Sequence, residues 1–148
     1  MASAAVMTAV ETRLAGVWTA TPIVAPTTTG QVPTDGSGFL AVEYPIAHEM
    51  QKSIGAPGSN TWREEGVVRF ILCAPIGQGL NPAADATQTP PTQPWANLLD
   101  ALRASFRGQT FSGITVFEVD ASEFNDQSDR GAYVEMYALA HYWFDIYG

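Results

Sequence analysis

The chain has 148 residues, of which 46% are hydrophobic and only 15% charged. This size and composition predict a single globular domain over residues 1–148, large enough to bury a core without disulfides or metals. Fifteen acidic against seven basic residues give a net charge of −8, which argues against nucleic acid as a direct ligand because an acidic surface repels phosphates. The single cysteine, Cys73, excludes an internal disulfide, and its apolar neighbours predict a buried thiol.

Residues 1–16 lack the basic leader and continuous apolar run of a signal peptide. No stretch contains the roughly 18 consecutive apolar residues needed to cross a bilayer. We therefore expect a soluble protein that stays where it is made and has no membrane partner.

An amphipathic helix is predicted from about Ala2 to Gly16. Three- and four-residue spacing places its apolar residues on one face, namely Met7, Val10, Leu14 and Val17. The following stretch, Thr19–Gly38, contains three prolines, three glycines and a run of threonines. It reads as a long irregular connection, and loops of this length often have a functional or interface role.

Two strands follow, predicted over Phe39–Ala47 and Trp62–Ala74, with a polar turn between them. The pair is expected to form a long hairpin. Pro45 lies within the first strand and must occupy an edge or a bulge, because proline cannot donate a ladder hydrogen bond.

Beyond a proline-rich linker, Asn81–Pro94, the sequence predicts a second helix that ends at Gly108. Its apolar stripe consists of Trp95, Leu98, Leu99, Leu102 and Phe106. A short strand over Ile114–Asp120 and an acidic loop over Ala121–Gly131 come next.

The final segment, Ala132–Tyr147, has apolar residues at every second position, which predicts a half-buried strand. The order of elements predicts an α+β fold: an antiparallel sheet of about four strands with two helices packed on one face, and a long hairpin extension. Sixteen extended residues span about 53 Å, whereas a compact chain of this size has a diameter of about 40 Å. Either the strand bends at a bulge or another chain covers its end, and we favour self-assembly.

The apolar strand that ends near Pro75 runs into a turn containing Gly77 and Gly79, where a phosphate site could begin. A P-loop needs a lysine and a hydroxyl residue directly after its glycines, and a dinucleotide site needs a helix there. Leu80, Asn81 and Pro82 follow instead. The pattern therefore favours a plain chain reversal.

His48 and Glu49 resemble the start of a zinc-protease motif, but Lys52 stands where the second histidine is required. His141 is read as a solvated or interface histidine. The acidic loop lacks the residue order of a calcium site and reads as solvated, with Phe124 as a contact residue.

Glu64 and Glu65 are adjacent on a strand, so they point to opposite faces and cannot share a proton. No serine or cysteine sits in the sequence context of a catalytic nucleophile. The sequence thus predicts neither an enzyme nor a cofactor nor a metal site.

The overall arrangement resembles the tail terminators of tailed phages and their relatives from gene-transfer agents. The likeness rests on an N-terminal helix ending near "VW", a first strand "FLAVEYPI", the segment "REEGVVRFILCAPIGQG", a helix "WANLLDALRASFRG" and a last strand opened by Arg130 and Gly131. Gly66 after the charged pair, with Pro75, Gly77 and Gly79 in the turn, also belongs to it.

This resemblance implies a structural virion protein: a homo-oligomeric ring, usually of six subunits, that caps the tail tube and joins it to the head connector. It would lie at the head-proximal end of the tail after assembly in the host cytoplasm, and DNA would pass through its acidic channel without specific binding.

The resemblance assigns no residue a role. We expect interfaces at the hairpin end, Ala47–Trp62, and at the loops around Pro26 and Phe124, with Pro26, Met50, Ile54, Trp62 and Phe124 as candidates. The alternatives are another neck or tail-tube component, or a small ligand-binding domain or enzyme that uses the Gly77/Gly79 turn.

Overall fold

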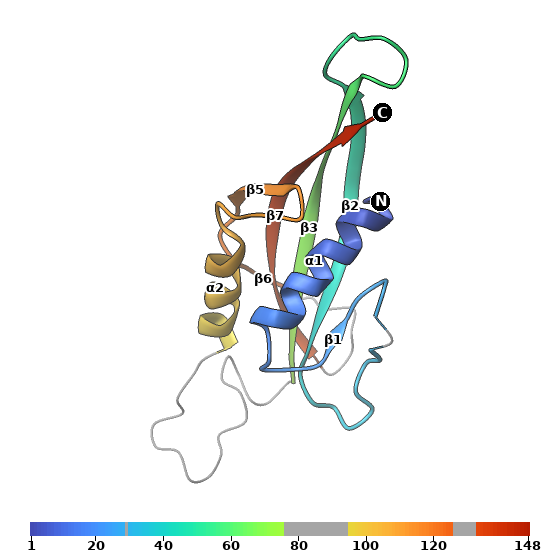
Figure 1. Ribbon diagram of the computed structural model, residues 1–148. Helices are drawn as coiled ribbons and strands as arrows, with labels where there is room; N and C mark the ends of the chain where they lie inside the picture. The colour runs from blue at the N-terminus through green and yellow to red at the C-terminus, as the bar shows by residue number, and fades with distance from the viewer. Residues whose placement is uncertain (29, 76–94, 126–132) are drawn as a thin grey trace.

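The computed structural model describes residues 1–28, 30–75, 95–125 and 133–148 (Figure 1). These residues form two helices and seven strands. In chain order they are α1 (Ala4–Val17), β1 (Ile23–Val24), β2 (Phe39–Gln51), β3 (Thr61–Pro75), α2 (Trp95–Phe106), β4 (Thr110–Phe111), β5 (Ile114–Val119), β6 (Glu123–Asn125) and β7 (Tyr133–Tyr147).

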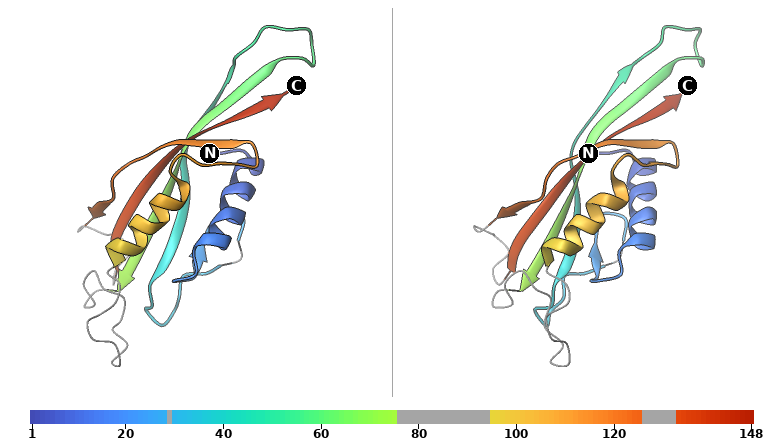
Figure 2. Two further views of the ribbon diagram at one scale, coloured as in Figure 1. Left: turned by 60° about the vertical axis from the view of Figure 1, so that its left-hand side comes forward. Right: turned by 90° about the vertical axis from the view of Figure 1, so that its left-hand side faces the viewer.

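All seven strands belong to one sheet, with the order β1-β2-β3-β7-β5-β4 and with β6 also pairing with β7. The β1–β2 pair is parallel, and the other pairs are antiparallel. The sheet curls into a half-barrel (Figure 2). The predicted fold, an antiparallel sheet of about four strands with two helices packed on one face, is therefore wrong, because the sheet has seven strands, includes a parallel pair and curls into a half-barrel.

The error has two physical sources. Strands β1, β4 and β6 are only two or three residues long, which is too short for an alternating pattern to be recognisable in sequence. The curl accompanies register shifts, one in β2 between Glu43 and Ile46 and one in β5 between Val116 and Glu118. An extra residue in one strand of a pair bends that strand and increases its twist.

The longer elements lie close to their predicted positions. Strands β2 and β3 form the expected hairpin, and Pro45 lies inside the register shift, as expected of a proline within a strand. Gly108, with a φ of 66°, follows α2 in the left-handed conformation that favours glycine at a helix end.

The main core lies between the two helices and one side of the curled sheet. Helix α1 contributes Val6, Val10 and Leu14, each at most 1% exposed, and α2 contributes Leu99 and Phe106. From the sheet come Leu40, Val42, Tyr44, Val68, Phe70, Leu72, Ala74, Ile114, Val116, Met136, Ala138, Ala140 and Tyr142. Burial of these apolar side chains attaches the helices to the sheet.

A smaller cluster occupies the opposite side of the sheet, near the end where β2 begins. It contains Phe39, Ala41, Ile71, Cys73 and Tyr133, with the Phe39 and Tyr133 rings packed edge to face. Cys73 is fully buried, which confirms the predicted buried thiol.

Strands β3 and β7 pair along fifteen residues without a register shift, from Thr61 opposite Tyr147 to Pro75 opposite Tyr133. One end of this ladder, together with β2, projects beyond the helices (Figures 1 and 2). In the described ranges, no helix is long and apolar enough to cross a membrane.

Candidate interaction surface: a projecting three-stranded arm

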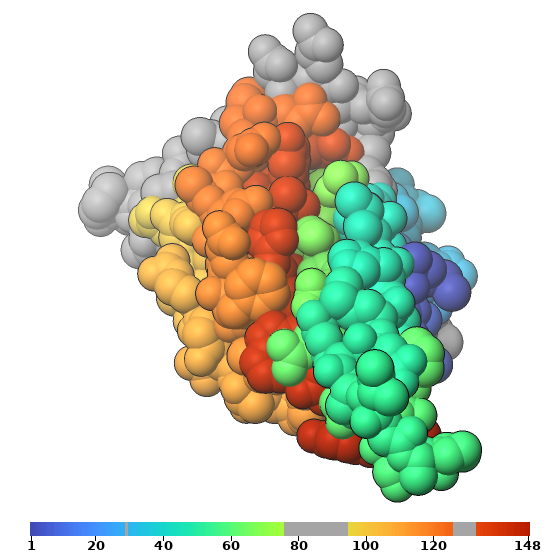
Figure 3. Space-filling model, turned by 90° about the horizontal axis from the view of Figure 1, so that it is seen from above, coloured from blue at the N-terminus to red at the C-terminus, as the bar shows by residue number. Residues whose placement is uncertain are grey.

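The projecting end of the sheet extends well beyond the two helices (Figure 1), and we call it the arm. It consists of residues 46–66, which are the far half of the β2–β3 hairpin, and residues 142–147 of β7. Seen from above, the hairpin end protrudes from the rest of the molecule (Figure 3). A segment of this kind offers surface to a partner without disturbing the core.

The base of the arm is fixed by a buried carboxylate. Glu64 is only 4% exposed, and its Oε1 accepts hydrogen bonds from the Tyr142 hydroxyl at 2.7 Å and from the Ser3 backbone N–H at 3.0 Å. Burial, followed by the hydrogen bond and charge of Glu64, raises the pKa of Tyr142 above its ordinary value. This network joins the N-terminus of α1 to both β3 and β7.

Gly66 lies beside this network, and the close approach of its neighbours requires a glycine. A Cβ at this position would come within 2.6 Å of both the Tyr142 hydroxyl oxygen and the Ile46 carbonyl oxygen. Contacts that short are repulsive. The glycine that follows the charged pair in the sequence therefore has a local packing reason.

One face of the arm carries charged side chains that are held in place. The Arg63 guanidinium donates two hydrogen bonds to the Asp145 carboxylate, at 2.6 and 2.8 Å, and stacks 3.7 Å from the centre of the Trp143 ring. These hydrogen bonds are the main reason that the pKa of Asp145 lies below its ordinary value. On the same face, Lys52 and His48 lie 3.4 and 4.0 Å from Glu65.

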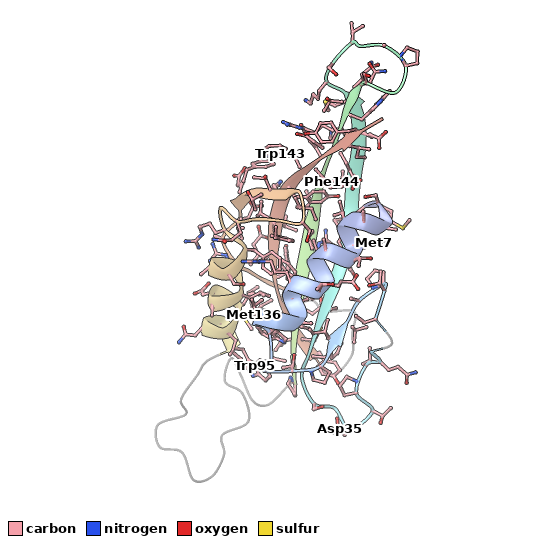
Figure 4. The ribbon with its side chains drawn as sticks, in the orientation of Figure 1. Met7, Asp35, Trp95, Met136, Trp143 and Phe144 are labelled. Carbon is pink, nitrogen blue, oxygen red and sulfur yellow. The ribbon has the colours of Figure 1, made fainter. Side chains whose placement is uncertain are left out.

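The opposite face of the arm is apolar along β3 and β7, whereas β2 places the exposed Glu49 and Gln51 on it. Trp62 is paired with Ile146. Phe144 lies two residues nearer the core along β7 and is paired with Glu64. Lower on the sheet the helices cover this face, but Trp62, Phe144 and Ile146 remain partly exposed. Figure 4 shows Phe144 and its neighbour Trp143 on β7 at the level where the arm leaves the body.

Large apolar side chains also stand in solvent at the rim and tip of the arm. Ile54 in the turn is 99% exposed, Tyr147 at the end of β7 is 80% exposed and Ile46 on β2 is 61% exposed. Single exposed apolar residues are common. Three of them around one projecting sheet, next to a partly open aromatic face, mark a surface suited to contact.

Three of the five predicted interface residues come together on the arm. Met50 lies on the charged face, Trp62 on the apolar face and Ile54 in the turn. The other two lie elsewhere. Pro26 is exposed in the turn after β1, and Phe124, 55% exposed, is paired with Met136.

Phe124 is distant from the arm. Its partner Met136 lies ten residues along β7 from Ile146, which corresponds to roughly 33 Å of strand. The structure thus separates this candidate contact from the hairpin end.

Sequence reasoning missed the Arg63, Trp143 and Asp145 cluster. A signal was present, because Trp143 and Asp145 lie two residues apart on the polar side of the alternating final strand. What the pattern could not supply was the register that places Arg63 opposite Asp145.

The remaining sequence-level candidates do not form a site in the described ranges. Glu64 and Glu65 point to opposite faces, as predicted, and His141 lies 3.2 Å from Asp120. No group of three metal-binding side chains occurs in those ranges. The Gly77/Gly79 turn, Asp126, Asp129, Arg130 and Gly131 fall outside the described residues.

Comparison with known proteins adds no family to these observations: no protein-family model matches the chain, and a search of the curated proteins finds no match.

Proposed function

We propose that this protein is a structural virion protein, a tail terminator that assembles into a ring, caps the tail tube and joins it to the head connector. The observation that carries the proposal is the arm, which leaves the body with apolar side chains along β3 and β7 on one face, a charged opposite face and an exposed tip. Trp62, Phe144 and Ile146 on its apolar face are partly exposed. The proposal needs no catalytic group or cofactor.

A ring of identical copies explains why the sheet extends so far. A three-stranded extension that is solvated on both faces gains little from burial in an isolated chain. Packing of the arm against a neighbouring copy would remove Ile54, Trp62 and Tyr147 from water. Contacts that join one patch to a different patch of the next copy close into a ring when the rotation between copies permits.

The electrostatics suit a channel through which DNA passes. The net charge is −8, and four basic residues of the described ranges are already paired with carboxylates: Lys52, Arg63, Arg69 and Arg103. Acidic side chains are therefore left in excess. A wall of that sign repels the phosphate backbone and lets it move without sticking.

The proposed mechanism is surface matching. One face of the ring copies the contact that a tube subunit makes with its neighbour, and the other face lacks it, so tube growth stops. The exposed Phe124 and Pro26 lie away from the arm and are available for contacts along the tail axis. The partners are the tube protein on one side and the head-tail connector on the other.

Two measurements test the proposal: the mass of the assembled protein and its effect on the length of tail tubes. Light scattering after size exclusion of the full chain should give the mass of a closed ring, with six copies expected from the family resemblance. Addition of the chain to polymerising tube protein from the same particle should shorten the tubes and place density at one end in electron micrographs. Incorporation along the whole tube would instead identify a tube subunit.

Variants separate the arm from the rest of the surface. Ile54→Asp and Tyr147→Asp replace side chains that are 99% and 80% exposed, so folding should be unaffected while ring mass and capping are lost. Val32→Asp, at a residue 45% exposed outside the arm, is the matched control for ring assembly and should retain the ring mass. A wild-type chain that forms no ring and leaves tube length unchanged would refute the proposal.

A further inference from the structure

Within the described residues, no strand pairs with the outer edge of β2 in the arm. The Lys52 N–H donates to the Thr61 carbonyl at 2.8 Å, so in the antiparallel β2–β3 ladder every second residue from Lys52 faces β3. The backbone groups of Ala47, Glu49 and Gln51 therefore point away from β3. Strand β1 covers only Leu40 and Ala41, and no other strand in the described residues lies beside this edge of β2.

The outer edge of β7 in the arm likewise has no strand paired with it in the ranges that the structure describes. The Gly148 N–H donates to the Asn60 carbonyl at 3.0 Å, which places the backbone groups of Asp145 and Tyr147 on the side away from β3. On that side β5 pairs with β7 only as far as Phe144. In the described part of the chain, nothing is paired with β7 beyond that point.

These two edges are complementary in direction. Strands β2 and β7 both run antiparallel to β3, which lies between them. They are therefore parallel to each other and form the opposite borders of one three-stranded sheet. When copies are related by rotation about an axis along the arm, each copy presents its β7 border to the β2 border of the next in parallel orientation.

We propose that the end of β7 in one copy forms a parallel ladder with the arm portion of β2, residues 46–51, in the next copy. This inference rests on the proposed ring and specifies how its subunits join. The backbone groups of Asp145 and Tyr147 bond with those of Ala47, Glu49 and Gln51 of the neighbouring copy. The arms then form one continuous sheet around the ring.

The side chains agree with this pairing. In a parallel ladder, a residue that faces its partner strand lies beside a residue whose own groups face away. Asp145 and Tyr147 thus lie beside His48 or Met50 of the next copy. Arg63 is paired with Met50 of β2 on one side and with Asp145 of β7 on the other, so these three side chains lie on one face of the arm. At the junction, the β7 residue and the β2 residue beside it therefore point to the same face of the sheet.

A symmetric pairing of β2 with β2 from a second copy is the competing arrangement. It would satisfy the groups of Ala47, Glu49 and Gln51 but leave those of Asp145 and Tyr147 open in each copy. It would also stop at two copies. The β7–β2 junction satisfies both edges of every arm, and closure of the ring leaves no free edge.

Site-specific cross-linking tests the junction. In a Cys73→Ala background, single variants His48→Cys and Tyr147→Cys and the double variant are treated with a short bismaleimide. The junction predicts a ladder of products from dimer up to the full ring for the double variant, and monomer for each single variant. Dimers from His48→Cys alone would show β2–β2 pairing and overturn the inference.

A backbone substitution tests the hydrogen bonds themselves. Glu49→Pro removes an N–H that faces away from β3, so no bond within the chain is lost, whereas Glu49→Ala removes the same side chain and keeps the N–H. The proline variant should weaken ring association roughly tenfold per junction, and the alanine variant should not. A thermal melt of both variants establishes that the monomer is folded.

The outcomes separate this inference from the proposed function. If the double variant has the mass of a ring but gives no cross-links, the junction is refuted and the ring is not. The same holds if Glu49→Pro leaves ring association unchanged. A folded monomer that does not cap tubes would refute both. If Glu49→Pro prevents folding, Gln51→Pro, whose N–H also faces away from β3, serves in its place with Gln51→Ala as control.

Discussion

The hydroxyl of Tyr142 donates a 2.7 Å hydrogen bond to Oε1 of Glu64, a carboxylate that is 4% exposed. The same oxygen accepts the backbone N–H of Ser3. One buried charge therefore connects the start of α1 to the two longest strands, at the level where the arm begins. A buried carboxylate is tolerated only while its hydrogen bonds are made.

Removal of the tyrosine hydroxyl should destabilise the fold. Tyr142→Phe leaves the buried carboxylate of Glu64 with the Ser3 N–H as its remaining protein donor in the described structure, and the expected loss is about 1–3 kcal/mol in the free energy of unfolding. Urea denaturation followed by tryptophan fluorescence measures it. Tyr147→Phe, at an exposed hydroxyl, is the control and should change nothing; equal stability of the two variants would contradict the role given to Glu64.

Stability should fall at alkaline pH. Burial raises the pKa of both Tyr44 and Tyr142 above the ordinary value of 10.0, and the adjacent carboxylates Glu11 and Glu64 reinforce the shift. A group whose pKa is raised on folding favours the folded state fully below its unfolded pKa and loses this contribution as pH rises above it. The melting temperature should therefore decline above about pH 10.

The double variant Tyr44→Phe/Tyr142→Phe should show a shallower decline above that pH, although it is less stable at neutral pH. Tyrosinate absorbance checks the assignment, because ionisation of these two residues should accompany unfolding. A wild-type melting temperature that stays level well above pH 10 would show that neither tyrosine is protected.

The space beside Gly66 should not accept a methyl group. In Gly66→Ala the new Cβ meets the Tyr142 hydroxyl oxygen and the Ile46 carbonyl at 2.6 Å, and the expected destabilisation is about 1–3 kcal/mol. Gly16→Ala, on α1 with no atom within 4 Å of its new Cβ, should instead stabilise by about 0.4–1 kcal/mol. Thermal melts of both variants should show shifts of opposite sign, and shifts of the same sign would contradict the close approach at Gly66.

The pKa of Asp145 should respond more strongly to the loss of Arg63 than to the loss of Lys52. Hydrogen bonds from Arg63 are the first cause of its lowered pKa, and Lys52 is a minor one. Arg63→Gln should therefore raise the pKa of Asp145 towards 3.8, and Lys52→Gln should raise it less. Because this pKa is lowered, the stabilising contribution is present above pH 3.8 and is lost as pH falls further.

Carboxyl carbon chemical shifts followed by NMR across this pH range measure the Asp145 pKa directly. Arg69→Gln, which breaks the separate ion pair with Glu43, is the control and should leave the titration of Asp145 unchanged. A larger shift with Lys52→Gln than with Arg63→Gln would invalidate the paired geometry of Arg63 and Asp145.

The sequence predicted the long elements well because each carries many repeats of its own period. Fifteen residues of β7 alternate between apolar and mixed positions, and α2 has a clear apolar stripe. Short elements carry no such signal. Strand β1 has two residues inside a proline-rich connection, and it is held by its parallel pairing with Leu40 and Ala41, a contact that no local pattern reveals.

The same limit applied to the arm. Alternation along β3 and β7 separated the faces correctly, so Glu64 and Glu65 could be placed on opposite sides. Which residues meet across strands depends on register, and a shift of one residue would invert every face. The stacking of Arg63 on Trp143 and its bond to Asp145 therefore emerged only from the structure, as did the curl of the sheet.

The unbroken ladder between β3 and β7 also has a mechanical consequence. Its bonds run from the buried body to the tip without a bulge, so a pull along the strands loads many of them together in shear instead of peeling them one after another. The arm then behaves as a stiff strut that passes tension from its tip to the interior.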